Sequence, residues 1–376
     1  MKIEIGKKIQ QKEGFLAFIP NSFPPKGIFD LPQEILLKTA KADRLIGKVD
    51  GITQLLPDVD FFITMFVAKD AESSAQIEGT KATIVDAMEK KAGVATKEID
   101  ADDILYYIKA LDYGLKRIEK LPLSLRFICE LHDKLMTGAR ASHFSAPGSF
   151  RKSQNWIGGT TPNNASFVPP PIHEMQNALN DLEKFLHDEK ATLPLIHIAF
   201  SHAQFETIHP FLDGNGRTGR LLITMLMQHK SMLEKPVLFL SAYFKKHRQI
   251  YYQKLYGYHQ GEIGAWIDFF LDGVIETAEE AIVISKKITK LRETDMAKIQ
   301  ALAKRESESG ISVLQKLYGQ PIISTKTIMD WTGFSRAGSQ KVIDRFIKLG
   351  ILESKDEKKS YNRSYYYKKY IDIFMG

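Results

Sequence analysis

Apolar residues recur at three- and four-residue spacing along most of the chain, and this pattern predicts a mainly helical fold. Helices are predicted between residues 32 and 120, with a break at Pro57, and again at 123–136, 173–187, 193–208, 217–229 and 248–288. Residues 286–308 are polar and charged, which predicts a solvated helix or a linker.

Two segments depart from this pattern. Residues 151–171 place two short apolar runs around a turn rich in Gly, Thr and Asn and end in three prolines, which predicts a β-hairpin that the prolines stop. Residues 325–332 and 335–348 predict two short helices, and residues 351–352 and 365–367 predict two strands around a charged loop. Helix, turn, helix and a two-stranded wing together are the layout of a small winged helix-turn-helix domain at 311–376.

The composition limits the class of protein. Of 376 residues, 44% are hydrophobic and 26% are charged, which excludes a disordered chain and predicts two or three domains. The first 20 residues lack an apolar stretch of signal-peptide length, and no apolar run approaches the roughly 20 residues of a spanning helix. We therefore expect a cytoplasmic protein without a membrane span. A single cysteine, Cys129, excludes an internal disulfide and a cysteine-based metal site, and we expect it in the core.

Positive charge is concentrated near the end of the chain. Residues 301–376 hold 14 Lys and Arg against 8 Asp and Glu, while the rest is almost balanced. This tail could bind a polyanion such as DNA on its own, although winged helices also serve as packing domains. A DNA-binding regulator is therefore one function that the sequence leaves open. Its candidate phosphate contacts are Arg336, Lys341, Arg345 and Lys348 in the second short helix and Lys358, Lys359 and Arg363 in the wing.

The segment that carries chemistry lies at residues 209–220, His-Pro-Phe-Leu-Asp-Gly-Asn-Gly-Arg-Thr-Gly-Arg, directly before an apolar helix. Gly214 and Gly216 flank Asn215, so backbone N–H groups can converge on an anion at the positive end of that helix. Such an arrangement is a phosphate cradle, although an Asp-Gly-Asn-Gly run is also typical of a plain turn or helix cap.

Side chains of the same segment complete the set. Arg217 and Arg220 are three residues apart, so we expect both on one face of the helix, gripping phosphate oxygens. Asp213 offers a hard oxygen for the Mg²⁺ that a nucleotide polyphosphate brings. His209, largely neutral at pH 7, can take the proton of an attacking hydroxyl. Together these groups suit transfer from a nucleotide onto a hydroxyl.

A metal hydrolase is the third function considered. His197, His202 and His209 are candidate ligands, but spacings of five and seven residues do not give the i, i+4 histidine pair of a helical zinc site. We therefore expect His197 and His202 to pack or to cap.

Residues 209–220 resemble the Fic family motif, His-Pro-Phe-x-Asp-Gly-Asn-Gly-Arg-x-x-Arg, at every fixed position. The resemblance implies a helical Fic core at 121–288 that transfers AMP from ATP, with Mg²⁺, to a Ser, Thr or Tyr hydroxyl of a target protein. It implies that His209 is the base and Asp213 the Mg²⁺ ligand. It also implies a set of ATP-binding residues, with Tyr251 as the alternative to the last: Gly214, Asn215, Gly216, Arg217, Thr218, Gly219, Arg220 and Tyr252.

A second resemblance lies at Ser74-Ala-Gln-Ile-Glu78-Gly, which is similar to the family's inhibitory helix. It implies that Ser74 and Glu78, in an N-terminal helical region at 1–120, form a brake in which Glu78 pairs with Arg220 and withholds it from the γ-phosphate. A charge-assisted pair contributes about 1.5 to 3 kcal/mol. Holding 99% of molecules inactive takes about 2.7 kcal/mol, so one such pair is of the right size.

The hairpin at 151–171 resembles the family's flap, which docks an extended segment of the target by strand addition. We expect a target protein, which the sequence does not identify, to dock on this flap, and we expect the chain to modify itself as well. We also expect a linker helix at 289–310 between the Fic core and the winged helix. A homodimer is a further expectation. The family also includes members in which the equivalent glutamate helps to remove AMP, and this de-AMPylating activity stays open.

Overall fold

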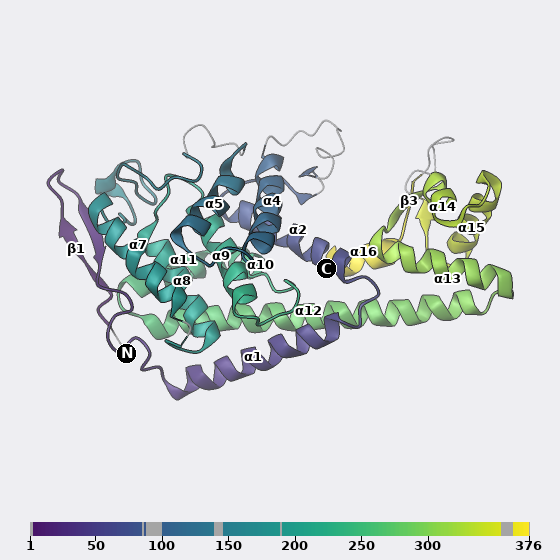
Figure 1. Ribbon diagram of the computed structural model, residues 1–376, viewed down its shortest axis with the longest axis horizontal. Coiled ribbons are helices and arrows are strands. Elements are labelled where there is room, and N and C mark those ends of the chain that lie inside the picture. Colours follow the sequence, from purple (N-terminus) through teal and green to yellow (C-terminus); the bar gives the residue numbers. More distant parts are fainter. Residues whose placement is uncertain are drawn as a thin grey trace. The chain divides into compact units, whose positions relative to one another are not determined.

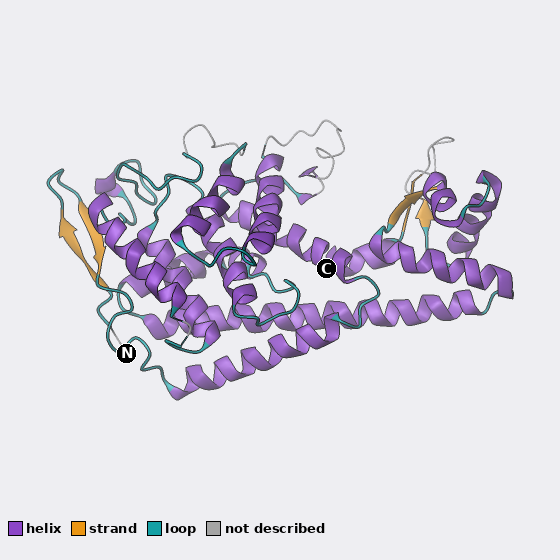
Figure 2. Cartoon of the chain, viewed as in Figure 1, coloured by secondary structure: helices purple, strands orange, loops and turns teal. Residues whose placement is uncertain are grey.

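The computed structural model describes residues 3–84, 86–87, 100–138, 146–188, 190–354 and 364–375. Helices make up most of this part of the chain and strands are few and short (Figure 2), so the predicted mainly helical fold is confirmed. Contacts divide the chain into two compact units, residues 1–47 with 66–278 and residues 48–65 with 279–376. The predicted domain limits at 120, 288 and 310 stay a prediction.

The first unit is built around two central helices, α8 and α9. Every residue of α8 from Leu195 to Ile208 is buried, and α9 is buried from Arg217 to Met227, as expected for helices covered on all sides. The elements of this unit (Figure 1) are β1 (Gly6–Gln10), β2 (Leu16–Pro20), most of α1 (Gln33–Thr53), the end of α2 (Val59–Ile77), α4 (Ala101–Arg117), α5 (Leu125–Met136), α7 (Ile172–His187), α8 (Pro194–Ile208), α9 (Asn215–His229), α10 (Ser241–Lys246), α11 (Arg248–His259) and the start of α12 (Ile263–Gln300).

The second unit contains a three-stranded antiparallel sheet in the order β3-β5-β4. Ser324 and Ser335 cap the two short helices that were predicted here, and Gly333 ends the first of them with a left-handed backbone, φ +69°. Both helices are confirmed, while the identification as a winged helix stays a prediction. The elements are the end of α1, the start of α2, the rest of α12, α13 (Lys304–Gly319), β3 (Ile322–Ser324), α14 (Thr325–Thr332), α15 (Arg336–Lys348), β4 (Glu353–Ser354), β5 (Ser364–Tyr366) and α16 (Lys368–Met375).

Several predicted limits are wrong. The strand expected at 351–352 lies at 353–354, and a third strand, β3, was not predicted. The helix expected over 248–288 is two helices, because Gly261 turns the chain between α11 and α12 with φ +84°. Helix α9 begins at Asn215, two residues earlier than expected. The wing residues Lys358, Lys359 and Arg363 lie outside the described residues.

The hairpin predicted at 151–171 is reduced to one antiparallel bridge between Ile157 and Phe167. The strands do not extend because Gly158 and Gly159 both have a left-handed backbone. The Asn164 side chain then accepts the N–H groups of Thr160 and Thr161, so the tip folds into a short 3-10 turn at Pro162–Asn164. We keep the name flap for residues 151–171.

An N-terminal hairpin was not predicted at all. Strands β1 and β2 pair antiparallel, with Gly6 opposite Pro20 and Gln10 opposite Leu16. Gly14, at φ +91°, supplies the left-handed residue of the turn. The sequence signal is short, because the apolar run at 15–19 is too brief to show a clear period.

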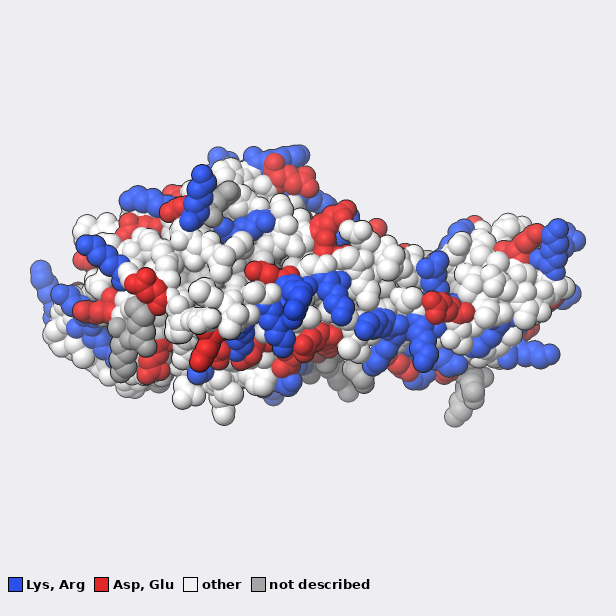
Figure 3. All heavy atoms as spheres, turned by 90° about the horizontal axis from the view of Figure 1, so that it is seen from below, with Lys and Arg blue, Asp and Glu red and all other residues white. Residues whose placement is uncertain are grey.

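Surface properties agree with the composition. Within the described part of the chain, no helix is long and apolar enough to cross a bilayer. On the face drawn in Figure 3, basic and acidic side chains are intermixed. Cys129, expected in the core, is only partly buried, and burial raises the pKa of its thiol to about 11.

Candidate functional site

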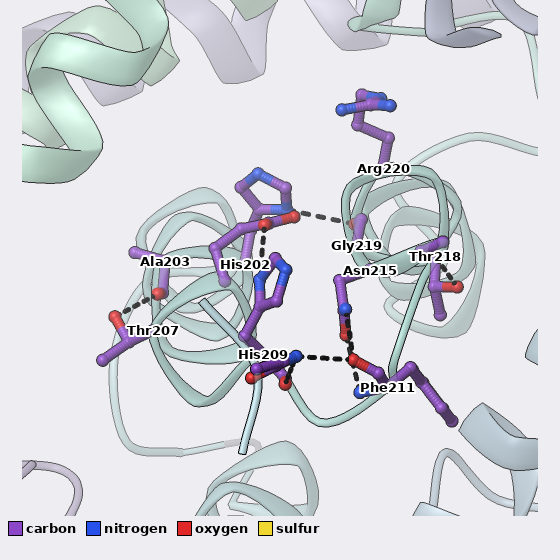
Figure 4. Close-up of polar contacts among 12 residues, drawn as sticks. His202, Ala203, Thr207, His209, Phe211, Asn215, Thr218, Gly219 and Arg220 are labelled. Atoms are coloured by element: carbon purple, nitrogen blue, oxygen red, sulfur yellow. Dashed lines mark hydrogen bonds and ion pairs between the residues drawn. The ribbon is translucent and has the colours of Figure 1, made fainter. Parts of the chain in front are cut away.

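The loop between α8 and α9 is folded tightly by its own sequence. His209 follows the last residue of α8 with a left-handed backbone, φ 49° and ψ 60°, and Gly214 has φ +77° where α9 begins. Between them, the Asn215 side chain accepts the Phe211 N–H and donates to the Phe211 carbonyl, both at 2.8 Å (Figure 4). Asn215, predicted as an ATP contact, therefore shapes the loop with its side chain.

Two polar side chains from the flap hold the same loop and were missed by the sequence analysis. Arg151 donates from Nε to the His209 carbonyl at 3.0 Å and from Nη2 to the Pro170 carbonyl at 2.5 Å. Asn155 donates to the Phe211 carbonyl at 2.8 Å. Arg151 is only 2% exposed, and burial lowers the pKa of its guanidinium to about 10. The flap is thus tied directly to the backbone at His209.

His132 supports the loop from α5. Its Nδ1 accepts the Gly148 N–H, so its Nε2 carries the proton and donates to the Asp213 carbonyl at 3.0 Å. Its ring stacks on Phe211 with centroids 3.7 Å apart. Burial lowers the pKa of His132 to about 4, which keeps the ring neutral. Next to it, Gly214 has a left-handed backbone, φ +77°, which favours glycine, and a Cβ there would also lie 2.6 Å from the sulfur of Met136.

The His209 imidazole faces a buried acid. Burial lowers the pKa of His209 to about 4, so at pH 7 the ring is neutral and can accept a proton. Its Nδ1 lies 3.9 Å from Oε2 of Glu206, one turn earlier on α8. Burial raises the pKa of Glu206 to about 8, so that this carboxyl is largely protonated at pH 7. Glu206 was not singled out in the sequence.

Ser74, Glu78 and Arg220 are in contact, although 142 residues separate the last two. Arg220 donates from Nε to Ser74 Oγ at 2.8 Å, and from Nη2 to the Ser74 carbonyl at 3.0 Å and to Glu78 Oε1 at 2.7 Å. Burial alone would raise the pKa of Glu78, but the Arg220 guanidinium outweighs burial and lowers that pKa. Burial likewise opposes the charge of Arg220, and Glu78 nevertheless raises its pKa.

The Glu78 carboxylate lies at the N-terminus of α9. A Cβ added to Gly216, in the first turn, would overlap Glu78 Oε1. Helix N-termini attract anions because their first N–H groups are unpaired and the helix dipole is positive there. The carboxylate therefore stands where a phosphate group would be favoured.

The other predicted residues of α9 contact protein groups rather than Glu78. Arg217 is buried, lies 3.7 Å from Asp103 Oδ1 and 3.9 Å from Asp213 Oδ2, and does not line the cavity that Arg220 lines. The expected role of Arg217 in holding phosphate oxygens stays a prediction. Thr218 donates to the Gly214 carbonyl at 2.8 Å, and the Gly219 carbonyl receives Nδ1–H of His202 at 3.0 Å (Figure 4).

A cavity of about 560 Å³ opens beside this loop, a size typical of small-molecule sites. One side is the loop between α8 and α9 together with Glu78, and the other side is the flap and aromatic residues of α11. The lining residues include Glu78, His209, Asp213, Gly214, Asn215, Gly216 and Arg220 on the first side and Trp156, Ile157, Phe167, Tyr252, Tyr256 and His259 on the second.

The two candidate tyrosines differ. Both line the cavity, but Tyr251 is buried and its hydroxyl donates to His202 Nε2 at 2.9 Å, whereas Tyr252 is 42% exposed. Tyr252 is therefore the more accessible of the two, with the Arg248 guanidinium 5.8 Å from its ring centroid. His197 bonds to the Phe185 carbonyl at 2.8 Å, so His197 and His202 pack as predicted.

No group of three or more metal-ligating side chains occurs among the residues that the structure describes. Asp213 is half-exposed, and its Oδ1 accepts the Gly214 N–H at 2.6 Å. One carboxylate fits the way proteins hold Mg²⁺ on a nucleotide, because phosphate oxygens and water supply the remaining ligands. The site thus suits an ion that arrives with a polyphosphate.

Two models of one family match the chain: the Fic/DOC family over residues 122–227 and the Fic/DOC family N-terminal region over residues 36–116. Curated relatives named "Protein adenylyltransferase Fic" include one from Drosophila persimilis, 27% identical over 274 residues (71% of this chain, 49% of the relative), and one from Aedes aegypti, 30% identical over 207 residues (53% of this chain, 38% of the relative). The chain spans about half the length of the curated relatives it matches.

Solved structures share the fold. A Fic family protein from Desulfovibrio desulfuricans G20 superposes with a TM-score of 0.58 at 17% identity, over 90% of this chain and 96% of that one. A Fic domain containing signaling protein from Bacteroides thetaiotaomicron gives 0.55 at 19% identity, over 66% of this chain and 97% of that one.

Proposed function

Since this chain belongs to the Fic/DOC family, we propose that it is a self-inhibited protein adenylyltransferase, which transfers AMP from ATP to a Ser, Thr or Tyr hydroxyl of a target protein and of itself. The observation that carries the proposal is the position of the Glu78 carboxylate, bonded to Arg220 at the N-terminus of α9 beside a neutral His209. The anion-binding backbone at Gly214–Gly216, which we call the anion seat, lies in one cavity with a cation, Arg220, and a base, His209.

The triphosphate of ATP takes the anion seat at Gly214–Gly216 once the Glu78 carboxylate leaves it. Arg220 keeps its two bonds to Ser74 and turns its freed N–H toward a phosphate oxygen. Asp213 would hold Mg²⁺ together with the phosphates, and the ion supplies neutralisation of the charge that develops on them.

His209 accepts the proton of the target hydroxyl as the hydroxyl oxygen attacks the α-phosphorus. The new bond joins that oxygen to AMP, and the bond that breaks releases pyrophosphate, so the imidazolium carries the proton at the end of the step. The Arg151 and Asn155 bonds to the loop hold His209 in place during this change. The ring face of Tyr252 stacks on the adenine.

Mass spectrometry of tryptic peptides tests the proposal. The Glu78→Gly protein is incubated with ATP and Mg²⁺, and we expect an AMP adduct on a hydroxyl-bearing peptide of the chain. The Glu78→Gly/His209→Ala protein is the matched control and should carry none. An unmodified Glu78→Gly protein, or equal adducts on both proteins, would contradict the proposal.

Removal of AMP is a second candidate activity, because Glu78 lines the same cavity as His209 and its carboxylate can orient water there. One experiment distinguishes addition of AMP from its removal. The chain is first modified by the Glu78→Gly protein, then freed of ATP and mixed with wild-type protein. Release of AMP that depends on Glu78 supports removal, and a stable adduct contradicts it.

DNA remains a proposed partner of residues 311–376. Arg336, Lys341 and Lys348 are exposed on α15, whereas the Arg345 guanidinium is engaged by Glu306. Binding of the whole chain to duplex DNA should weaken steeply with salt, by roughly one power of salt concentration for each phosphate contacted. The triple variant with alanine at the three exposed positions should lose this binding, and equal binding by both proteins would exclude α15.

A further inference from the structure

The N-terminal hairpin is attached to the flap, although neither family model covers it. The Phe18 N–H of β2 donates to the Val168 carbonyl at 2.9 Å, so β2 lies along the flap on the side opposite Ile157. Phe18 is 3% exposed. Its ring lies over β1, where a Cβ on Gly6 would meet the Phe18 ring at 2.6 Å.

Three rings join the hairpin, the flap and α11. Phe18 lies 5.8 Å from Phe167 and 5.2 Å from His259, centroid to centroid, and Phe167 stacks on His259 at 4.1 Å with 13° between the planes. Phe167 and His259 line the cavity, and Phe18 does not. Phe18 therefore reaches the site only through the other two rings.

The third ring connects to the helix that ends at His209. The Thr207 hydroxyl donates to the Ala203 carbonyl at 2.7 Å, so its oxygen accepts the Nε2–H of His259 at 3.0 Å. Thr207 precedes His209 by two residues. The hairpin is also anchored at its start, because the Ile3 N–H donates to the carbonyl of Gly261 at 3.3 Å.

The hairpin leaves one flap edge open. Ile157 uses both its N–H and its carbonyl on Phe167 and Ser166, and Phe18 takes the far side at Val168. Trp156, adjacent in sequence, is 39% exposed and lines the cavity. A target segment that adds as a strand therefore has the Trp156 edge to pair with, and the ring cluster decides how far that edge lies from His209.

We propose that Phe18 is a positioning residue for the acceptor: through Phe167 and His259 it holds the flap at a fixed distance from His209, and it has no part in nucleotide binding. The inference rests on the proposed function for its consequence in catalysis. The structural part of the inference, that Phe18 orders the flap, is independent of the proposed function.

The first test is hydrogen–deuterium exchange of the whole chain without nucleotide. Phe18→Ala should speed exchange of the flap amides at Ile157 and Phe167 by about tenfold, because their bridge opens more often. Leu16→Ala, a half-exposed residue of the same strand, is the matched control and should leave them unchanged. Phe18→Leu, which keeps most of the apolar volume, serves if the alanine variant does not fold. Wild-type exchange in a folded Phe18 variant overturns the inference.

The second test separates acceptor from nucleotide. Each hairpin variant is made in Glu78→Gly protein, and the acceptor is a tagged His209→Ala copy of the chain. Phe18→Ala should raise the KM for the acceptor by about tenfold and leave the KM for ATP within twofold, while Phe18→Tyr should return the KM for the acceptor to that of the parent protein. An equal effect on both KM values overturns a positioning role. If no acceptor is modified by any protein, the proposed function fails, and the exchange result still decides whether Phe18 orders the flap.

Discussion

Replacing Glu78 by glycine should release Arg220 without displacing it. Arg220 loses one of three acceptors, the Glu78 carboxylate at 2.7 Å, and keeps the Ser74 hydroxyl at 2.8 Å and the Ser74 carbonyl at 3.0 Å. The guanidinium therefore stays beside the N-terminus of α9, with one N–H available for a phosphate. Removing the seated carboxylate frees the anion seat in the same step.

The size of the effect follows from the contact. A charge-assisted hydrogen bond contributes about 1.5 to 3 kcal/mol. The Glu78 side chain is 37% exposed, and water screens such a pair, so the lower half of that range applies. Because about 1.4 kcal/mol corresponds to a factor of ten, the rate of AMP incorporation should rise by about ten- to fortyfold.

Initial rates of incorporation from ATP labelled at the α-phosphate measure this directly, at saturating ATP and equal protein. Glu78→Gln keeps the length of the side chain but loses its charge, so it should give an intermediate rate. Glu72→Gln, on the same helix and bonded to Gln76 rather than Arg220, is the matched control. A Glu78→Gly rate equal to wild type, from protein that binds ATP, would refute the reasoning.

Further predictions concern pH and stability. Burial raises the pKa of Glu206 to about 8, so the folded state is favoured by protonation and stability should fall as pH rises from about 5 to 8; Glu206→Gln should lack this fall in urea titrations. Burial lowers the pKa of His209 to about 4, and the charge of Glu78 partly offsets this. In Glu78→Gly protein, kcat/KM for ATP should therefore be independent of pH down to pH 5. A kcat/KM that falls to half its maximum near pH 6.5 would contradict a buried neutral base. Arg151→Met removes the donor of three carbonyls and leaves the buried Pro170 carbonyl unpaired, so it should lower the free energy of unfolding by about 1 to 3 kcal/mol. An unchanged urea midpoint would show that the flap is not held this way.

Local patterns predicted local structure well. The helices around α8, α9, α14 and α15 follow from apolar periodicity and from serine and glycine caps, which act within a few residues. The strands of the flap and of the N-terminal hairpin are harder to predict from the sequence. Their short strands are set by pairing with distant backbone, Ile157 with Phe167 and Phe18 with Val168, and a few residues carry too little periodicity to reveal it.

The candidate site divides in the same way. The motif at 209–220 is contiguous, so its chemistry could be inferred directly from the residues. The contact of Glu78 with Arg220 bridges 142 positions and was expected only through a family resemblance. Arg151, Asn155 and His132 carry no signal of their own, because their importance lies in the backbone carbonyls that tertiary packing places before them.

The surroundings of Arg217 show the same limit. Spacing alone placed it on one face with Arg220, and three residues on a helix do lie close together. The structure brings Asp103, from α4, within 3.7 Å of the Arg217 guanidinium, so a second element also holds this side chain. A partner on another element cannot be seen in a single helix.

The central claim is that the loop entering α9 seats the triphosphate of ATP beside His209. A crystal structure of the Glu78→Gly protein with Mg²⁺ and an ATP analogue that resists cleavage measures this most directly. The account predicts phosphate oxygens on the backbone N–H groups of Gly214–Gly216, one of them bonded to Arg220, and the α-phosphorus facing the His209 ring. A nucleotide bound elsewhere, with that loop facing only protein, would contradict it.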